Sequence, residues 1–403
     1  MGELIATKRN LLNITNLCMT EQQNAKRSDE IKFCSNGELT LGVEIELQLI
    51  DPQTLNLKSC AEKILNAAKP LTNKVKKEFY LSTIEVNTDK CENLFEVEKD
   101  LTASFDLMEK IAKDVDCKFA TTGCHAFSRY ADCIITQSQR YQQLVDRNQW
   151  LARRMTVYGL HVHLGMKSGD DAIRFNNFFL NFIPHLLAIS ASSPFWQGED
   201  TGLASCRPTT YESLPTAGTP YFVKNWQEFE GLYDKLRNCK AINSVKDLWW
   251  DLRPSPHYGT LEIRACDGLA TLDGALSVVA LIHLLANWFN DNASWLNQMP
   301  ITPAWMLREN KWHAIRHGLS ADLVTNVEGN YKLISDDIIE WLDKLKPYEQ
   351  KLGYKKYIDL LYKIIEKGNS SVRQRKIFAN NNSLQEVMQF NVAEFANRSP
   401  IWR

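Results

Sequence analysis

Two acidic side chains alternate with apolar ones in the segment 39–50, and their spacing is the first sign of chemistry in the sequence. Leu, Val and Ile occupy every second position, whereas Glu44 and Glu46 stand between them. In a β-strand these two carboxylates share one face, roughly 7 Å apart, because side chains alternate across the strand. Such a pair suits a hard divalent cation. A strand with one solvated face would give the same pattern, so both interpretations stay open here.

Histidines, a carboxylate and an arginine show the same alternation further along the chain. In 156–165, His161 and His163 lie between apolar residues and are flanked by glycines, which leaves room for a ligand beside them. In 259–267, Glu262 and Arg264 share the face opposite the apolar residues. The alternative for the two histidines is a purely structural role, and the alternative for Glu262 and Arg264 is a simple ion pair within the strand.

A second acidic segment, 78–91, carries Glu78 and Glu85. The two are seven residues apart and therefore have opposite parity in a strand, so they could reach one site only across a bend or bulge. Upstream of Glu262, Trp249, Asp251 and Arg253 share a parity, and Pro254 is expected to end that strand.

Together these strands carry too much charge for a protein interior unless a metal and an anionic ligand neutralise it. We therefore expect a sheet curved around a charged funnel. Several carboxylates with one or two histidines favour Mg²⁺ or Mn²⁺ over zinc. The arginines indicate a highly anionic substrate, most commonly a nucleoside triphosphate. The chain has no G-x-x-x-x-G-K-[ST], G-x-G-x-x-G or kinase-like H-R-D motif, which excludes a P-loop or Rossmann nucleotide site.

The elements that must position these residues can be outlined from hydrophobic periodicity. Helices are expected at 59–68, 97–115, 137–153, 170–190, 226–237, 273–290, 335–350 and 354–367. Ser168 has the position of an N-cap, so the two aspartates that follow it are interpreted as a helix start and not as a metal site. We expect residues 1–38 to form an extension, 39–403 one catalytic domain, and 299–403 its mostly helical C-terminal part.

Composition limits the kind of protein. The 403 residues include 47 Lys and Arg against 48 Asp and Glu, so no global field would attract nucleic acid or anionic lipid. Ten cysteines without a C-x-x-C pair fit reduced thiols and a cytoplasmic location. The N-terminus lacks the apolar stretch of a signal peptide. The apolar runs 178–196 and 274–289 are interpreted as buried helices, so no membrane partner is expected.

Several motifs in the same order make the chain resemble the type 2 glutamate-cysteine ligases, also called carboxylate-amine ligases. They are LGVEIELQ at 41–48, ExxxSxxExxT at 78–88, GCHAF at 123–127, QRYQ at 139–142, GLHVHLG at 159–165, SASSPFWQGEDTGLASCRP at 190–208, DLRPSPHYGTLEIRACD at 251–267 and ENKWHAIRHGL at 309–319. The resemblance covers most of 39–320 and implies an α+β, glutamine-synthetase-like fold, with a curved antiparallel sheet that forms a funnel backed by helices.

The resemblance also implies an activity and a set of site residues. The expected reaction joins the γ-carboxylate of glutamate to the amine of cysteine, or of a related amine, through a γ-glutamyl phosphate, with ATP consumed and ADP and phosphate released. The metal ligands implied for Mg²⁺ or Mn²⁺ are Glu44, Glu46, Glu78, Glu85, His161 and Glu262. Arg264 is implied to bind phosphate, and Arg253 phosphate or a substrate carboxylate. Tyr141, His163, Arg207, Asn310 and Arg316 are implied to line the nucleotide and substrate site.

Two other functions remain as alternatives. The His161-x-His163 pair would suit a metal-dependent hydrolase, although no eightfold β-α alternation surrounds it. The second alternative is a non-catalytic protein that keeps the fold and binds nucleotide or metal without turnover. The identity of the acceptor amine and the general base cannot be derived from the sequence, and a homodimer is expected by resemblance alone.

Overall fold

A largely antiparallel architecture is seen in the computed structural model, which describes residues 31–69, 73–295 and 302–402. The central sheet has the order β10-β11-β5-β1-β3-β2, and β4 pairs with the end of β1 that β5 leaves free. Its strands are β1 (Leu41–Ile50), β2 (Val75–Lys77), β3 (Thr83–Asn87), β4 (Lys118–Ala120), β5 (Leu160–Gly165), β10 (Leu252–Ser255) and β11 (Thr260–Ile263). All six pairings in this sheet are antiparallel.

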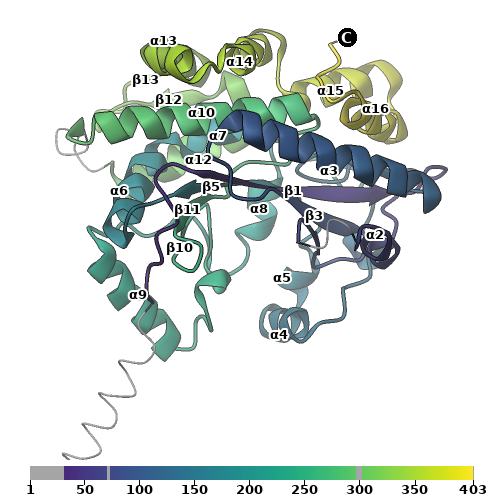
Figure 1. Cartoon of the computed structure of the whole chain (residues 1–403). Coiled ribbons are helices and arrows are strands. Elements are labelled where there is room, and N and C mark those ends of the chain that lie inside the picture. Colours follow the sequence, from purple (N-terminus) through teal and green to yellow (C-terminus); the bar gives the residue numbers. More distant parts are fainter. Residues whose placement is uncertain (1–30, 70–72, 296–301, 403) are drawn as a thin grey trace, which may run out of the picture.

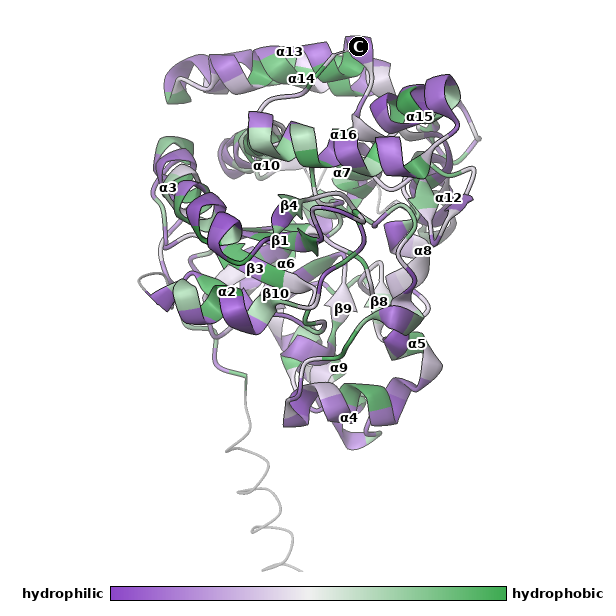
Figure 2. Ribbon diagram, turned by 90° about the vertical axis from the view of Figure 1, so that its right-hand side faces the viewer, coloured by the Kyte–Doolittle hydropathy of each residue, from purple (hydrophilic) through white to green (hydrophobic). Residues whose placement is uncertain are grey.

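Helices cover one face of this sheet in two layers (Figure 1). The inner helices are α3 (Leu94–Asp114), α6 (Gly169–Phe179), α7 (Ile183–Ser190), α10 (Leu272–Asp291) and α12 (Ala304–His317). The outer ones are α13 (Ile334–Leu352), α14 (Lys355–Lys367), α15 (Ser370–Asn381) and α16 (Leu384–Asn397). Figure 2 shows hydrophilic and hydrophobic residues interleaved along α3 and α13, as expected for helices with one buried face.

The remaining elements lie around the edges and the opposite face of the sheet. The helices are α2 (Ala61–Ala67), α4 (Gln139–Asn148), α5 (Trp150–Arg153), α8 (Arg207–Tyr211) and α9 (Trp226–Asn238). Short two-stranded sheets pair β6 (Phe195–Trp196) with β7 (Glu199–Asp200), β8 (Ala217–Gly218) with β9 (Trp249–Trp250), and β12 (Asp322–Val324) with β13 (Tyr331–Leu333). The C-terminal part is thus mostly helical, with the β12–β13 hairpin added.

The alternation expected for β1 is confirmed. Leu41, Val43, Ile45, Leu47 and Leu49 are each at most 2% exposed and belong to the main apolar core, together with residues of α3 and α10. The intervening polar side chains therefore point to the opposite face, which the inner helices leave open.

Two expected helices are interrupted in the structure. The helix predicted at 137–153 is divided into α4 and α5, because Gln149 between them has φ +50°, outside the helical region. The helix predicted at 170–190 is divided into α6, a 3₁₀ turn at Leu180–Phe182 and α7. Pro184 lies in the first turn of α7, where its missing N–H costs nothing. The Ser168 cap is confirmed, since its side chain accepts a hydrogen bond from the Asp171 N–H.

The expectation that Pro254 ends its strand is wrong. Pro254 lies inside β10 and pairs with Leu261 of β11. It is tolerated because β10 has a neighbour on one side only within the described sheet, so the missing N–H breaks no ladder.

The apolar run 274–289 lies within α10, which is long and apolar enough to cross a membrane by length and composition alone. In the structure, 83% of its most apolar window is buried by other parts of the chain, as the sequence predicted for a core helix. The nine cysteines among the described residues are free thiols. Of the predicted N-terminal extension, 1–30 lie outside the described residues, and the division into an extension and one catalytic domain stays a prediction.

Candidate active site

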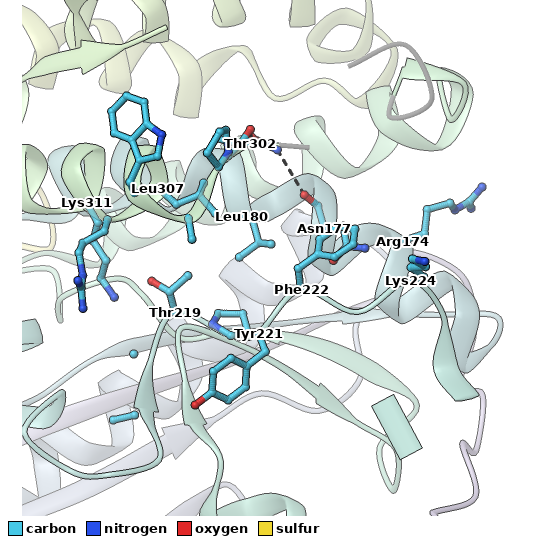
Figure 3. Close-up of a pocket in the computed structure, with 18 of the residues that line it drawn as sticks. Arg174, Asn177, Leu180, Thr219, Tyr221, Phe222, Lys224, Thr302, Leu307 and Lys311 are labelled. Carbon is cyan, nitrogen blue, oxygen red and sulfur yellow. Dashed lines mark hydrogen bonds between the residues drawn. The ribbon is translucent and has the colours of Figure 1, made fainter. Parts of the chain in front are cut away.

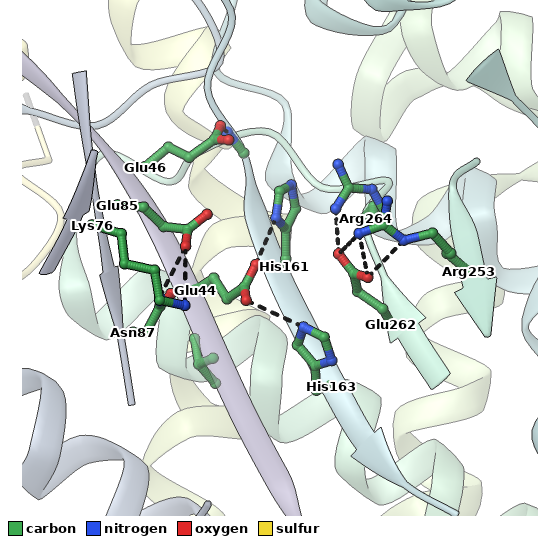
Figure 4. Close-up of polar contacts among 12 residues, drawn as sticks. Glu44, Glu46, Lys76, Glu85, Asn87, His161, His163, Arg253, Glu262 and Arg264 are labelled. Atoms are coloured by element: carbon green, nitrogen blue, oxygen red, sulfur yellow. Dashed lines mark hydrogen bonds and ion pairs between the residues drawn. The ribbon is translucent and has the colours of Figure 1, made fainter. Parts of the chain in front are cut away.

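The register of the central strands brings the predicted acidic and imidazole side chains onto one face. Glu44 of β1 lies opposite His161 of β5, and Glu46 lies opposite Glu85 of β3. Glu262 of β11 lies opposite His163 of β5. Figure 4 shows these side chains of β1, β3, β5 and β11 projecting into a common region.

Two overlapping groups of possible metal ligands result from this register. Glu44, His161 and Glu262 form one, and Glu46, Glu85 and His161 form the other; within each group the ligand atoms lie within 4.8 Å of one another. His161 belongs to both. Its Nδ1 is 3.3 Å from a Glu44 oxygen, whereas its buried Nε2 has no hydrogen-bond partner among the described residues. A buried unpaired imidazole nitrogen is costly, so the donor set fits a divalent cation.

Electrostatics in this cluster favour a cation. Burial, and next the charges of Glu85 and Glu46, raise the pKa of Glu78 well above its usual value. Burial and Glu44 raise the pKa of Glu85 to about 7. Burial also raises the pKa of Glu46, although Arg207 and Arg264 oppose the shift. A cation held among these carboxylates would favour their charged forms.

The bend required between Glu78 and Glu85 is present. Glu78 follows the last residue of β2, and Glu85 lies within β3, which runs back antiparallel to β2. The two glutamates do not lie on one strand, so the rule that residues of opposite parity point to opposite faces does not apply to them. A neighbour that the sequence analysis did not identify, Asn87, shares the face of Glu85 and donates a hydrogen bond to its Oε1 at 2.9 Å. Its i+2 spacing from Glu85 is a signal that could have indicated it.

Glu262 is held by both arginines that the sequence singled out. Arg253 donates from Nε to Oε2 at 2.9 Å and from Nη2 to Oε1 at 3.1 Å, and Arg264 also pairs with Oε1. Burial opposes ionisation, but Arg253 and Arg264 hold the pKa of Glu262 below its usual value. The cluster thus keeps at least one firmly ionised carboxylate beside two guanidinium groups.

Glu44 lies between the two histidines. Its oxygens are 3.3 Å from His161 Nδ1 and 3.4 Å from His163 Nε2. Burial opposes ionisation of Glu44, yet these contacts hold its pKa well below the usual value. His163 also contacts Thr260 Oγ1 at 2.8 Å, so both of its ring nitrogens are engaged, unlike those of His161.

A small cavity of about 60 Å³ adjoins the cluster. Its lining includes Glu46, Glu78, His161, Arg207 and Arg264, and aromatic groups including Phe79, Tyr211, Trp249 and Trp250 form much of the rest. Arg207 is buried and donates to the main-chain oxygen of Arg264 at 3.3 Å. Its guanidinium lies over the Tyr211 ring, 5.1 Å from the centroid.

Gly159 makes room for two of these side chains. A Cβ at this position would lie 2.4 Å from Arg207 Nη2 and 3.0 Å from His161 Nε2. We expect Gly159→Ala to lower the free energy of unfolding by about 2 kcal/mol and to weaken nucleotide binding, because the added methyl must displace Arg207. Chemical denaturation and a binding titration check this.

Gly231→Ala is the matched control for that substitution. Gly231 lies inside α9, and a Cβ there would meet nothing within 4 Å. It should leave binding unchanged and raise stability by a few tenths to about 1 kcal/mol through helix propensity. If both alanine variants behave alike, Gly159 has no special role in the site.

The other residues implied by the resemblance lie at different distances from the cluster. Tyr141 packs edge-on against Phe79, with 5.4 Å between ring centroids, and so lies beside Glu78. Asn310 exchanges hydrogen bonds of 2.9 and 2.7 Å with the main chain of Val324 in β12. Arg316 donates to the main-chain oxygen of Gly202. The structure therefore does not bring Asn310 and Arg316 to the carboxylates, and their roles in the site stay predictions.

Comparison with known proteins shows the family to which the chain belongs. Residues 40–390 match the model of glutamate-cysteine ligase family 2. A protein of Bdellovibrio bacteriovorus that carries the provisional name glutamate–cysteine ligase 2 is 42% identical over 358 residues, which cover 89% of this chain and 95% of that protein. A protein of Gloeobacter violaceus with the same provisional name is 38% identical over 365 residues, covering 89% and 97% of the two chains.

Solved structures share the fold at low sequence identity. The glutamate–cysteine ligase of Francisella tularensis, solved in complex with AMP, matches with a TM-score of 0.59 at 12% identity and covers 92% of this chain and 91% of that one. A bifunctional glutathione synthetase from Pasteurella multocida matches with a TM-score of 0.58 at 14% identity, covering 90% of this chain and 52% of that one. The predicted glutamine-synthetase-like α+β fold is confirmed. On the family model and the two relatives, this chain belongs to glutamate-cysteine ligase family 2.

Proposed function

We propose that this protein is an ATP-dependent carboxylate-amine ligase that joins the γ-carboxylate of glutamate to the amine of cysteine or of a related amine. The observation that carries the proposal is the pair of ligand groups that share His161, with Arg264 beside them. Membership of the family supports the same reaction class. We also propose a cytoplasmic location, because ten cysteines without a C-x-x-C pair fit thiols that are kept reduced.

Two steps would make the amide. A glutamate γ-carboxylate oxygen attacks the γ-phosphorus of ATP, and the bond to the bridging oxygen breaks to give γ-glutamyl phosphate and ADP. The amine then attacks the activated carbonyl carbon, the C–O bond to phosphate breaks, and phosphate and a proton leave. The first step is needed because a free carboxylate is a poor acyl donor.

The side chains of the site suit the binding of phosphate more than covalent catalysis. Arg264 and Arg207 would bind phosphate oxygens, and their charge would stabilise the phosphoryl group during transfer. Glu44, His161 and Glu262, or Glu46, Glu85 and His161, would hold Mg²⁺ or Mn²⁺, which would supply positive charge against that of the phosphate oxygens. No cysteine is required as a nucleophile, since ATP supplies the activation.

The alternative of a hydrolase built on the histidine pair has less support from the geometry. His163 is in neither ligand group, and both of its ring nitrogens are engaged by Glu44 and Thr260. The two histidines therefore do not offer a pair of free nitrogens to one zinc ion, which such a site would need.

The decisive experiment is a screen of products by mass. Purified protein is incubated with ATP, glutamate, Mg²⁺ or Mn²⁺ and each of twenty amino acids, and ADP release is measured in parallel. We expect ADP together with a γ-glutamyl amide whose mass identifies the acceptor, and hydroxylamine should trap the acyl phosphate as a hydroxamate. No ADP with any combination would overturn the proposal, turnover with zinc and no ATP would support the hydrolase, and nucleotide binding without product would support a non-catalytic protein.

A further inference from the structure

We propose that Lys311 is a positioning residue that fixes Arg207 and Arg264 through Asp251 and Tyr211. The inference rests on the proposed function, because it assigns Lys311 to the phosphate-binding arginines of that same site. Lys311 lies on α12, outside the carboxylate cluster. Neither its position in the sequence nor its charge predicts a role in the site.

The ammonium group of Lys311 is enclosed by the protein. Its side chain is 6% exposed, and Nζ pairs with the carboxylates of Asp251 and Glu212. Asp251 is completely buried. A buried ion pair of this kind gains little net stability over well-packed apolar groups, because both charges must be taken out of water. The presence of the pair therefore calls for an account beyond stability.

Asp251 is the point at which Lys311 is linked to the site. Its carboxylate accepts hydrogen bonds from Lys311 and from the Tyr211 hydroxyl, and from Thr219 at 3.3 Å. Its main-chain oxygen accepts the N–H of Arg264 at 2.7 Å. The residue therefore joins α12, α8 and the end of β11 at one point.

The contacts close into a ring. Asp251 accepts the hydrogen bond from the Tyr211 hydroxyl, and the Arg207 guanidinium lies over the aromatic ring of Tyr211, 5.1 Å from its centroid. Arg207 in turn donates to the main-chain oxygen of Arg264, whose N–H returns to Asp251. Arg207 and Arg264 both line the site cavity, so the ring fixes the Arg207 guanidinium relative to the main chain from which the Arg264 side chain projects.

Lys311 supports this ring from the side of a second, wider cleft of about 2130 Å³. Figure 3 shows Lys311 and Leu307 on one side of this cleft and Thr219 and Tyr221 on the other. Glu212 also lines the cleft and is partly exposed there. Without the ammonium group, the Asp251 carboxylate would stay buried with only hydroxyl partners. It would be expected to shift or bind water, and the contacts to Tyr211 and Arg264 would change with it.

Lys311→Met tests the inference, because methionine has a similar length and no charge. Two readouts are used in the full-length protein below its melting temperature: steady-state kinetics for ATP and glutamate, and calorimetric binding of inorganic triphosphate with Mg²⁺. We expect kcat/KM for ATP to fall at least tenfold and the Kd for triphosphate to rise at least fivefold, whereas KM for glutamate changes less than threefold.

Two further variants complete the design. Tyr211→Phe removes only the hydroxyl that reaches Asp251 and should shift the same two readouts in the same direction, by at least twofold; it decides the matter if Lys311→Met does not fold. Arg308→Met changes an exposed cation on the same helix and in the same cleft, and it should match the wild type.

A merely structural role predicts a different result. Lys311→Met would then lower the melting temperature and the folded fraction, but ATP KM and triphosphate Kd of the folded protein would equal those of the wild type; this outcome overturns the inference. Absence of triphosphate binding by the wild type also overturns it. If the wild type releases no ADP with any acceptor, yet Lys311→Met weakens triphosphate binding as expected, the proposed function fails and the positioning role stands.

Discussion

Glu44→Gln is expected to lower metal-dependent ADP release by about 100-fold or more, with a change in melting temperature of only a few degrees. Glutamine keeps the size of the side chain and one carbonyl oxygen, but it removes the charge that lies between His161 and His163. Loss of one well-placed electrostatic group at a reacting centre typically costs about 3 to 4 kcal/mol. The fold should tolerate the change, because the loss of the charge contacts with the two histidines is partly offset by the loss of repulsion between Glu44 and Glu85.

Steady-state assays across a range of Mn²⁺ concentrations, together with thermal melting, check this prediction. Glu62→Gln, at an exposed position in the first turn of α2, is the matched control and should behave as the wild type. Unchanged activity in Glu44→Gln would remove Glu44 from the site. A large fall in melting temperature would assign it a structural role instead.

Arg264→Met should have an effect of similar size, about 10²- to 10³-fold on turnover, for a different reason. The substitution removes a partly buried guanidinium that faces the cavity and pairs with Glu262, so both phosphate binding and the local charge balance change. Glu262 keeps its two hydrogen bonds to Arg253, which should preserve the strand pairing. We therefore expect a folded protein with weakened ATP binding.

The measurement is kcat together with the KM for ATP and the KM for glutamate, with Arg308→Met as the control at an exposed arginine. A fall in kcat with a raised KM for ATP and an unchanged KM for glutamate agrees with a phosphate-binding role. Unchanged kcat and ATP KM, or a rise confined to the KM for glutamate, would contradict the assignment of Arg264 to phosphate.

The sequence was informative wherever the relevant contact is local along a strand. Glu44 with Glu46, His161 with His163, and Glu262 with Arg264 each share a face because alternation across a strand depends only on position. The register between strands then brings these pairs together, as the Glu44–His161 and Glu46–Glu85 pairings show. Alternation alone does not specify that register, since the two pairings join residues that are 117 and 39 positions apart in the chain.

The interpretation was less successful where tertiary context decides. Pro254 was expected to end a strand, but an edge position tolerates its missing N–H. Trp249, Asp251 and Arg253 were expected to share a face, yet the chain bends at Asp251, whose carboxylate turns to Lys311 while Arg253 pairs with Glu262. The contact between Asp251 and Lys311 joins residues 60 positions apart and has no local signature.

The most direct test of the account is where the metal binds. Crystals grown with Mn²⁺ and a non-hydrolysable ATP analogue would be examined for anomalous scattering at the manganese edge. We expect a peak within coordination distance of His161 Nε2, flanked by Glu44 and Glu262 or by Glu46 and Glu85, with the triphosphate oxygens against it. Manganese bound elsewhere, or a triphosphate seated away from these strands, would contradict the claim that this sheet face is a metal–nucleotide site.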